Sequence, residues 1–205
     1  MRRYAWLTIF AIAMAYLEAA VVVYLRALYY PQGFDFPLVL IPAREAAVEI
    51  AREAATIVML WVGGRLGAAT GWQAFAGFMF LFGVWDIFYY VWLKVILGWP
   101  ASLLTWDVLF LLPLVWVGPV ISAVLVAVSL VAAGAILLGL ETRDRAPVMS
   151  GRLWGGFAVA LLLLLGAFMG NHAAIRGDGM PGAFPWIPYG AGFALGWAVF
   201  LRALR

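Results

Sequence analysis

Acidic residues embedded in apolar sequence are the chemically active feature of this chain. Asp86 lies within FGVWDIFYYVWLK, and Glu18 lies within LEAAVVVYLR. Glu45, Glu49 and Glu53 recur at every fourth position, which predicts a stripe down one face of a helix. Carboxylates can bind cations, carry protons or act as general acids and bases. In apolar surroundings each one needs a partner, a proton or a water-filled cavity.

The residues after Asp86 indicate a polar helix face. Tyr90 follows one turn later and Lys94 two turns later, so a helix places all three on roughly one side. The Tyr90 hydroxyl could then donate to the Asp86 carboxylate. Asp107, in LLTWDVLF, has two interpretations: a helix cap, or a lip of the same cavity that faces Lys94.

The first and second apolar segments each carry a glutamate that needs a basic partner. Arg26 lies eight residues after Glu18, about 12 Å along a helix, which is too far for an ion pair. We therefore expect the partner of Glu18 on another helix, with Arg52 as the candidate. Arg52 also follows Glu49 by three residues and precedes Glu53, with which we expect it to form a pair inside the membrane.

Each of these residues also has a structural interpretation. The glutamate stripe could be a salt-bridged helix above the bilayer, and Asp86 could be a hydrogen-bonded tie between helices. The single histidine, His172, has the position of a solvated loop residue. Glu49, Glu53 and His172 are weak candidates for metal ligands, because HExxH and Cys/His spacings are absent and the chain has no cysteine. The sequence assigns no cofactor.

The composition is that of a membrane protein. Of 205 residues 67% are hydrophobic and 11% are charged, against about 25% charged in soluble domains; the mean hydropathy is +1.03. Apolar runs of membrane-spanning length continue along the whole chain, which predicts a single transmembrane domain over 1–205 in contact with the lipid bilayer. The net charge of +3 indicates topology and not nucleic-acid binding.

The runs predict an all-α, polytopic helix bundle with six spanning helices. We place these at about 5–25, 50–69, 73–95, 119–140, 153–171 and 184–202. Six crossings put both termini on one side, together with eight of the 13 basic residues: Arg2, Arg3, Arg65, Arg143, Arg145, Arg152, Arg202 and Arg205. The positive-inside rule makes that side cytoplasmic. We expect the membrane to be the cytoplasmic (plasma, inner) membrane.

The apolar stretch over 102–118 directly precedes the predicted span at 119–140. With the following span it is about 57 Å long as a helix, too long for one crossing. Pro113 and Gly118-Pro119 interrupt it. We expect a re-entrant or interfacial segment on the outer face.

Three functions remain open from the sequence. The first is binding or translocation of a cation, a proton or a small polar solute at an outward-facing carboxylate site. The second is an accessory or assembly subunit of a larger membrane complex. The third is a membrane-embedded carboxylate or metal enzyme, and the sequence does not decide whether the protein is an enzyme. The expected partners are other copies of this chain or other membrane subunits. The expected binding residues are Glu18, Glu49, Arg52, Glu53, Asp86, Tyr90, Lys94 and Asp107.

Overall fold

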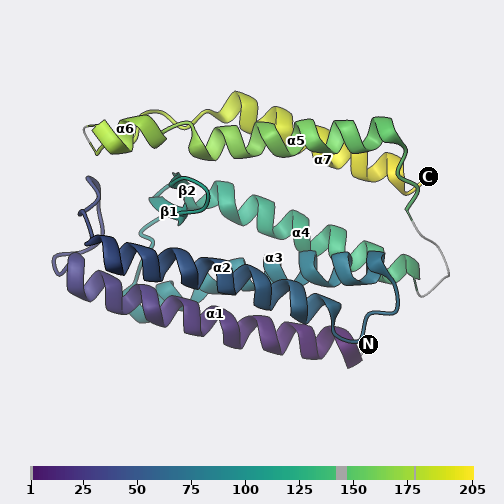
Figure 1. The fold of residues 1–205 in the computed structure, drawn as a ribbon, viewed down its shortest axis with the longest axis horizontal. Coiled ribbons are helices and arrows are strands. Elements are labelled where there is room, and N and C mark those ends of the chain that lie inside the picture. Colours follow the sequence, from purple (N-terminus) through teal and green to yellow (C-terminus); the bar gives the residue numbers. More distant parts are fainter. Residues whose placement is uncertain (1, 142–146, 178) are drawn as a thin grey trace.

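The chain folds into a bundle of helices whose axes run roughly along one direction (Figure 1). This computed structural model describes residues 2–141, 147–177 and 179–205. The helices are α1 (Arg2–Tyr29), α2 (Ala43–Arg65), α3 (Gly71–Leu97), α4 (Val120–Glu141), α5 (Gly151–Met169), α6 (His172–Gly177) and α7 (Trp186–Ala203). Two short strands, β1 (Trp106–Phe110) and β2 (Trp116–Pro119), lie between α3 and α4 in the chain.

Four helical segments are long and apolar enough to cross a membrane: α1, α3, α4 and the segment of α5 that continues into α6. The other two long helices fall short for different reasons. The first half of α2 carries the charged sequence AREAAVEIARE, and α7 is 18 residues long with polar and glycine positions. Helical membrane-protein architecture is therefore supported, whereas the predicted crossings at 50–69 and 184–202 are not confirmed.

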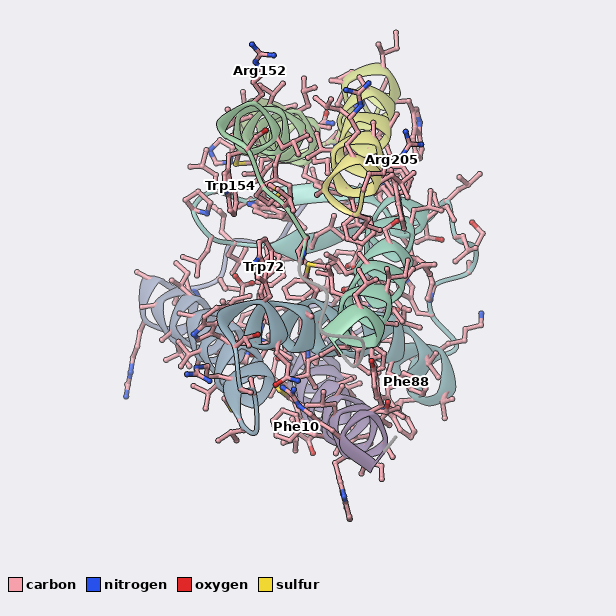
Figure 2. The ribbon with its side chains drawn as sticks, turned by 90° about the vertical axis from the view of Figure 1, so that its right-hand side faces the viewer. Phe10, Trp72, Phe88, Arg152, Trp154 and Arg205 are labelled. Carbon is pink, nitrogen blue, oxygen red and sulfur yellow. The ribbon has the colours of Figure 1, made fainter. Side chains whose placement is uncertain are left out.

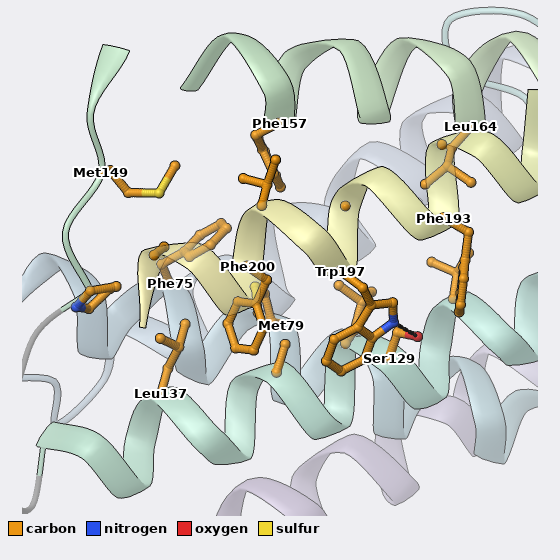
Figure 3. Close-up of a pocket in the computed structure, with 18 of the residues that line it drawn as sticks. Phe75, Met79, Ser129, Leu137, Met149, Phe157, Leu164, Phe193, Trp197 and Phe200 are labelled. Carbon is orange, nitrogen blue, oxygen red and sulfur yellow. Dashed lines mark hydrogen bonds between the residues drawn. The ribbon is translucent and has the colours of Figure 1, made fainter. Parts of the chain in front are cut away.

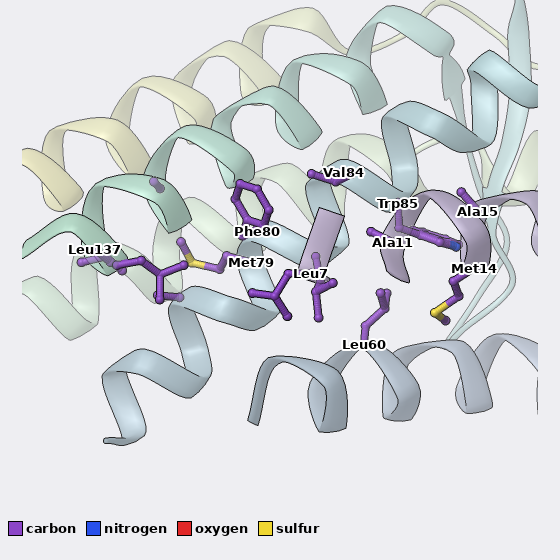
Figure 4. Close-up of a cluster of buried hydrophobic side chains, with 14 residues drawn as sticks. Leu7, Ala11, Met14, Ala15, Leu60, Met79, Phe80, Val84, Trp85 and Leu137 are labelled. Carbon is purple, nitrogen blue, oxygen red and sulfur yellow. The ribbon is translucent and has the colours of Figure 1, made fainter. Parts of the chain in front are cut away.

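Helix α3 holds the lower part of the bundle together. It packs against α1, α2 and α4, while α5 pairs with α7 to form a separate layer. The main apolar core lies where α1, α2, α3 and α4 meet, and Figure 4 shows Leu7, Leu60 and Trp85 pointing into it from three of these helices. Gly134 lets α4 approach α3 closely, because a Cβ there would lie 2.8 Å from the Ala76 carbonyl oxygen.

Lys94 forms hydrogen bonds with backbone carbonyls just beyond the end of α3. Gly98 ends this helix in the left-handed conformation, with φ of 68°. The Lys94 ammonium donates to the Gly98 carbonyl at 2.9 Å and to the Pro100 carbonyl at 2.8 Å. The expectation that Lys94 faces Asp107 is therefore wrong: the Lys94 ammonium contacts backbone carbonyls at the helix terminus, and Lys94 does not line the cavity that contains Asp107.

The segment over 102–118 forms an antiparallel β-hairpin. Asp107 lies opposite Gly118, and Val108 lies opposite Val117. The strands WDVLF and WVGP are rich in the aromatic and β-branched residues that favour strands, yet the all-α prediction did not include them. The hairpin lies near the end of the bundle that is opposite both termini (Figure 1).

Both chain ends lie at the same end of the bundle (Figure 1), because the long helices alternate in direction. Figure 2 looks onto that end, with Arg152 and Arg205 near its edge and Trp72 and Trp154 between the layers. The rings of Trp72 and Trp154 are stacked at 6.4 Å and link α3 with α5. Arg143 and Arg145, which were assigned to this side, lie outside the described residues.

Candidate functional site

A cavity of about 660 Å³ lies between α1, α2, α3, the hairpin and the loop over 30–42. It is toward the end of the bundle opposite the termini, where this loop and the hairpin lie (Figure 1). Seven of the eight expected binding residues line it, and Lys94 does not: Glu18, Glu49, Arg52, Glu53, Asp86, Tyr90 and Asp107. The structure thus brings together acidic groups from α1, α2, α3 and β1.

Arg52 joins two carboxylates from different helices. Its guanidinium forms an ion pair with Glu18 of α1, and its Nε donates to Glu49 Oε2 at 2.8 Å. The Thr56 hydroxyl donates to the second oxygen of Glu18 at 3.0 Å. Arg52 is the partner that the spacing of the sequence led us to expect for Glu18. Because these groups are largely shielded from water, their pairing ties α1 to α2.

Glu53 holds the hairpin and does not form the expected ion pair with Arg52. The side chain of Glu53 lies on the buried face of α2 and is 7% exposed. Its Oε2 accepts a hydrogen bond from the backbone N–H of Leu111 at 2.8 Å. Leu111 follows β1 directly, where that N–H has no strand partner to bond. The carboxylate therefore supplies the acceptor for a partly buried turn amide.

Asp107 pairs with Arg26 instead of capping a helix. Its carboxylate is 2% exposed and accepts from Arg26 Nη2 at 3.2 Å. The Arg26 guanidinium also lies over the ring of Trp99 at 3.7 Å and over that of Phe34 at 4.4 Å. Burial raises the pKa of the Asp107 carboxyl to about 6, and the nearby Arg26 guanidinium and Tyr90 hydroxyl act to lower it.

Asp86 lines the cavity without a partner. No described side chain or backbone group forms a hydrogen bond or ion pair with its carboxylate. The expected Tyr90 donor is wrong, because the Tyr90 hydroxyl interacts with Asp107 instead. The rings of Trp85, Tyr89 and Tyr90 line the same wall as Asp86. Asp86 therefore differs from the other four acidic residues of the cavity, each of which has a partner.

The weak metal interpretation is not supported by the positions of its residues. Within the described ranges, no three His, Cys, Asp or Glu side chains lie close enough together to hold a metal ion. His172 begins α6 and does not line the cavity that contains Glu49 and Glu53. The three candidate ligands are therefore not brought together.

A second cavity, of about 180 Å³, lies between helices α3 and α4 on one side and the α5–α7 layer on the other (Figure 3). Figure 3 shows Phe75, Phe157 and Phe200 turned toward it, and a hydrogen bond of 3.0 Å from Trp197 Nε1 to the Ser129 hydroxyl. No charged residue is among the described residues that line it. The first cavity is therefore the one with groups able to do polar chemistry.

Sequence reasoning missed several residues of the charged cavity. Arg26 was considered only as a partner for Glu18 in the same helix, and Trp85 and Tyr89 were not among the expected binding residues. The available signal for Arg26 was a guanidinium at the end of an apolar run, where it needs a carboxylate from elsewhere in the chain. The aromatic residues carried no such signal, because Trp and Tyr are abundant throughout this sequence.

The chain matches no known protein family. It also matches no curated protein and no solved structure. The functional proposal therefore depends on the charged cavity alone.

Proposed function

We propose that the chain is a six-span membrane protein whose charged cavity opens toward the outer side and binds a cation or a small polar solute. In this arrangement α2 and α7 supply the two crossings beyond the four apolar segments. The assignment of α2 and α7 as crossings is supported by their direction, because both helices run alongside the four apolar segments through the bundle (Figure 1). The hairpin is the re-entrant segment, and its polar backbone is tolerated at membrane depth because protein surrounds it.

The proposed orientation follows from the distribution of arginine. Arg3, Arg65, Arg152, Arg202 and Arg205 belong to the ends of helices at which the two termini lie. Positive residues accumulate on the cytoplasmic side of membrane proteins. We therefore assign the termini to the cytoplasm, the chain to the cytoplasmic membrane, and the cavity to the opposite side.

The observation that carries the proposal is the charge of the cavity lining. Five carboxyl groups and only two guanidinium groups line it among the described residues. Clefts lined by one sign of charge and bounded by apolar walls concentrate ions of the opposite sign. The lining therefore favours a positively charged solute, or a polar solute that presents a positive end.

Cysteine labelling tests this proposal, because the chain has no native cysteine. Val22 lines the cavity, and Val22→Cys is nearly isosteric. We expect a cationic methanethiosulfonate reagent, added from the outer side, to label this thiol at least about tenfold faster than an anionic reagent of similar size. Each rate is first divided by the rate of the same reagent with a free thiol in solution.

The matched control is Val91→Cys. Val91 is 41% exposed on α3 and does not line the cavity. We expect slow labelling there by both reagents, because the thiol faces lipid. No labelling at position 22, or equal normalised rates for the two reagents, would contradict a water-accessible, negatively charged cavity.

A further inference from the structure

We propose that the ligand of the charged cavity is an organic ammonium, with its positive nitrogen beside Asp86 and an apolar substituent along the aromatic wall. This inference rests on the proposed function and narrows it to one chemical class. Protonated amines and quaternary ammonium groups share this chemistry, whether they belong to a free solute or to a lipid headgroup.

The first support is that Asp86 is available. Glu18 and Glu49 are engaged by Arg52, Glu53 by the Leu111 amide and Asp107 by Arg26. A cation that bound one of these would have to displace an existing partner. Asp86 has none among the described residues, so a cation can neutralise it without that loss.

The second support is the aromatic wall beside Asp86. Trp85 stacks on Tyr89 at 6.3 Å between ring centroids, and Tyr89 meets Tyr90 edge-on at 5.0 Å. Phe110 of the hairpin lies 6.4 Å from Trp85 and lines the cavity from another side. Aromatic faces next to a carboxylate are the surroundings in which proteins bind ammonium groups.

The third support is size. A water molecule occupies about 30 Å³ in the liquid, and sites for small organic ligands are about 300–1,000 Å³. The cavity, at about 660 Å³, lies in the range for organic ligands and is far larger than an inorganic ion requires. In the described residues a divalent metal ion would also lack a cluster of three ligands.

The fourth support is the apolar part of the lining. Val22 and Leu25 of α1, Leu38 of the loop, Ile50 of α2 and Leu109 of β1 all contribute to the cavity. Such a surface favours an apolar substituent over a sugar or a polyamine, whose polar groups would lose water without gaining partners. The single unpaired carboxylate further favours a ligand with one positive charge.

Calorimetric titration of the purified full chain in detergent with phenethylammonium tests the proposal. We expect saturable binding of phenethylammonium and at least about tenfold weaker binding of the neutral phenethyl alcohol and of the anion phenylacetate. Asp86→Asn should weaken binding of phenethylammonium at least tenfold. The matched control is Asp35→Asn in the exposed loop over 30–42, and we expect unchanged affinity for it.

Two further measurements separate loss of the binding site from loss of the fold. Asp86→Asn removes no hydrogen bond or ion pair within the part of the chain that the structure describes, so its thermal midpoint should not fall below that of the parent. Tyr89→Leu keeps the carboxylate and removes one aromatic face, and it should weaken phenethylammonium more than it weakens phenethyl alcohol. Equal affinity of the parent and Asp86→Asn for phenethylammonium would overturn the proposal, as would stronger binding of phenylacetate.

Native mass spectrometry distinguishes the two sources of the ammonium group. Retention of phosphatidylethanolamine by the parent and its loss from Asp86→Asn identify a lipid headgroup, whereas retention by neither chain, with phenethylammonium still bound, identifies a free amine. Both results support an ammonium ligand. Charge-selective labelling of Val22→Cys without any phenethylammonium or lipid binding would overturn the ligand class and leave the proposed cation cavity intact.

Discussion

Replacement of Arg52 by Gln should destabilise the protein, because this residue neutralises two carboxylates. The side chains of Glu18 and Glu49 are 11% and 8% exposed, so neither is well solvated without its partner. Removing one member of a buried ion pair costs about 3–5 kcal/mol. For a chain of about 200 residues, 1 kcal/mol shifts the thermal midpoint by roughly 2–4 °C. We therefore expect a decrease of at least about 6 °C for Arg52→Gln.

The thermal midpoint is measured by circular dichroism of the purified protein in detergent. Arg65→Gln is the matched control, because Arg65 is an exposed residue at the end of the same helix and, among the described residues, donates only to the Ala68 carbonyl. Surface substitutions of this kind change stability by about 0.5 kcal/mol or less, so we expect a shift within about 2 °C.

A double-mutant cycle tests the cause of the loss. Glu18→Gln alone should cost less than Arg52→Gln, because Arg52 retains Glu49. The double variant should lose less than the sum of the two single losses, since one uncompensated carboxylate is gone. If the losses add, or if Arg52→Gln shifts the midpoint no more than Arg65→Gln, the ion pairs do not tie α1 to α2 as described.

Three further predictions concern the hairpin, the helix packing and the buried aspartate. Glu53→Ala should speed hydrogen exchange at the Leu111 amide, because that N–H loses its acceptor. The exchange rate is measured by mass spectrometry, and an unchanged rate would contradict the contact. Gly134→Ala should cost about 1–3 kcal/mol by overpacking against α3, while Gly155→Ala, with open space around it, should be neutral or stabilising in the same thermal assay. Because the folded state holds the Asp107 proton to a pKa of about 6, above its ordinary value of 3.8, stability should fall as pH rises from about 4 to about 6. The fall in thermal midpoint over this window should be smaller in Asp107→Asn, and an equal fall would refute the assignment.

Hydropathy was enough to locate the helices, because an apolar run of spanning length has few alternatives in lipid. The predicted spans at 73–95 and 119–140 lie within two residues of α3 and α4 at each end. A charged helix was one interpretation of the glutamate stripe, and α2 does begin at Ala43, before the predicted span at 50–69. The strands of the hairpin were not, since a short apolar run with aromatic residues suits a buried helix and a strand equally.

Which side chains pair within the cavity depends on how each helix is rotated about its axis. The spacing of residues in the sequence does not define this rotation. Arg52 was predicted as the ion-pair partner of Glu18 because few basic residues lie in the apolar segments, and the structure contains this pair. Tyr90 was assigned to Asp86 because the two lie one turn apart on α3. The hairpin instead brings Asp107 to Tyr90, a contact between residues 17 positions apart in the sequence that no helical periodicity predicts.

The most direct test of the cation site is the labelling of Val22→Cys in the presence and absence of the Asp86 carboxylate. We expect the normalised preference for the cationic reagent to be large in Val22→Cys and to drop severalfold when Asp86→Asn is added, because the unpaired negative charge is removed from the cavity. The same preference in both proteins, or no preference in either, would contradict a cation site at Asp86.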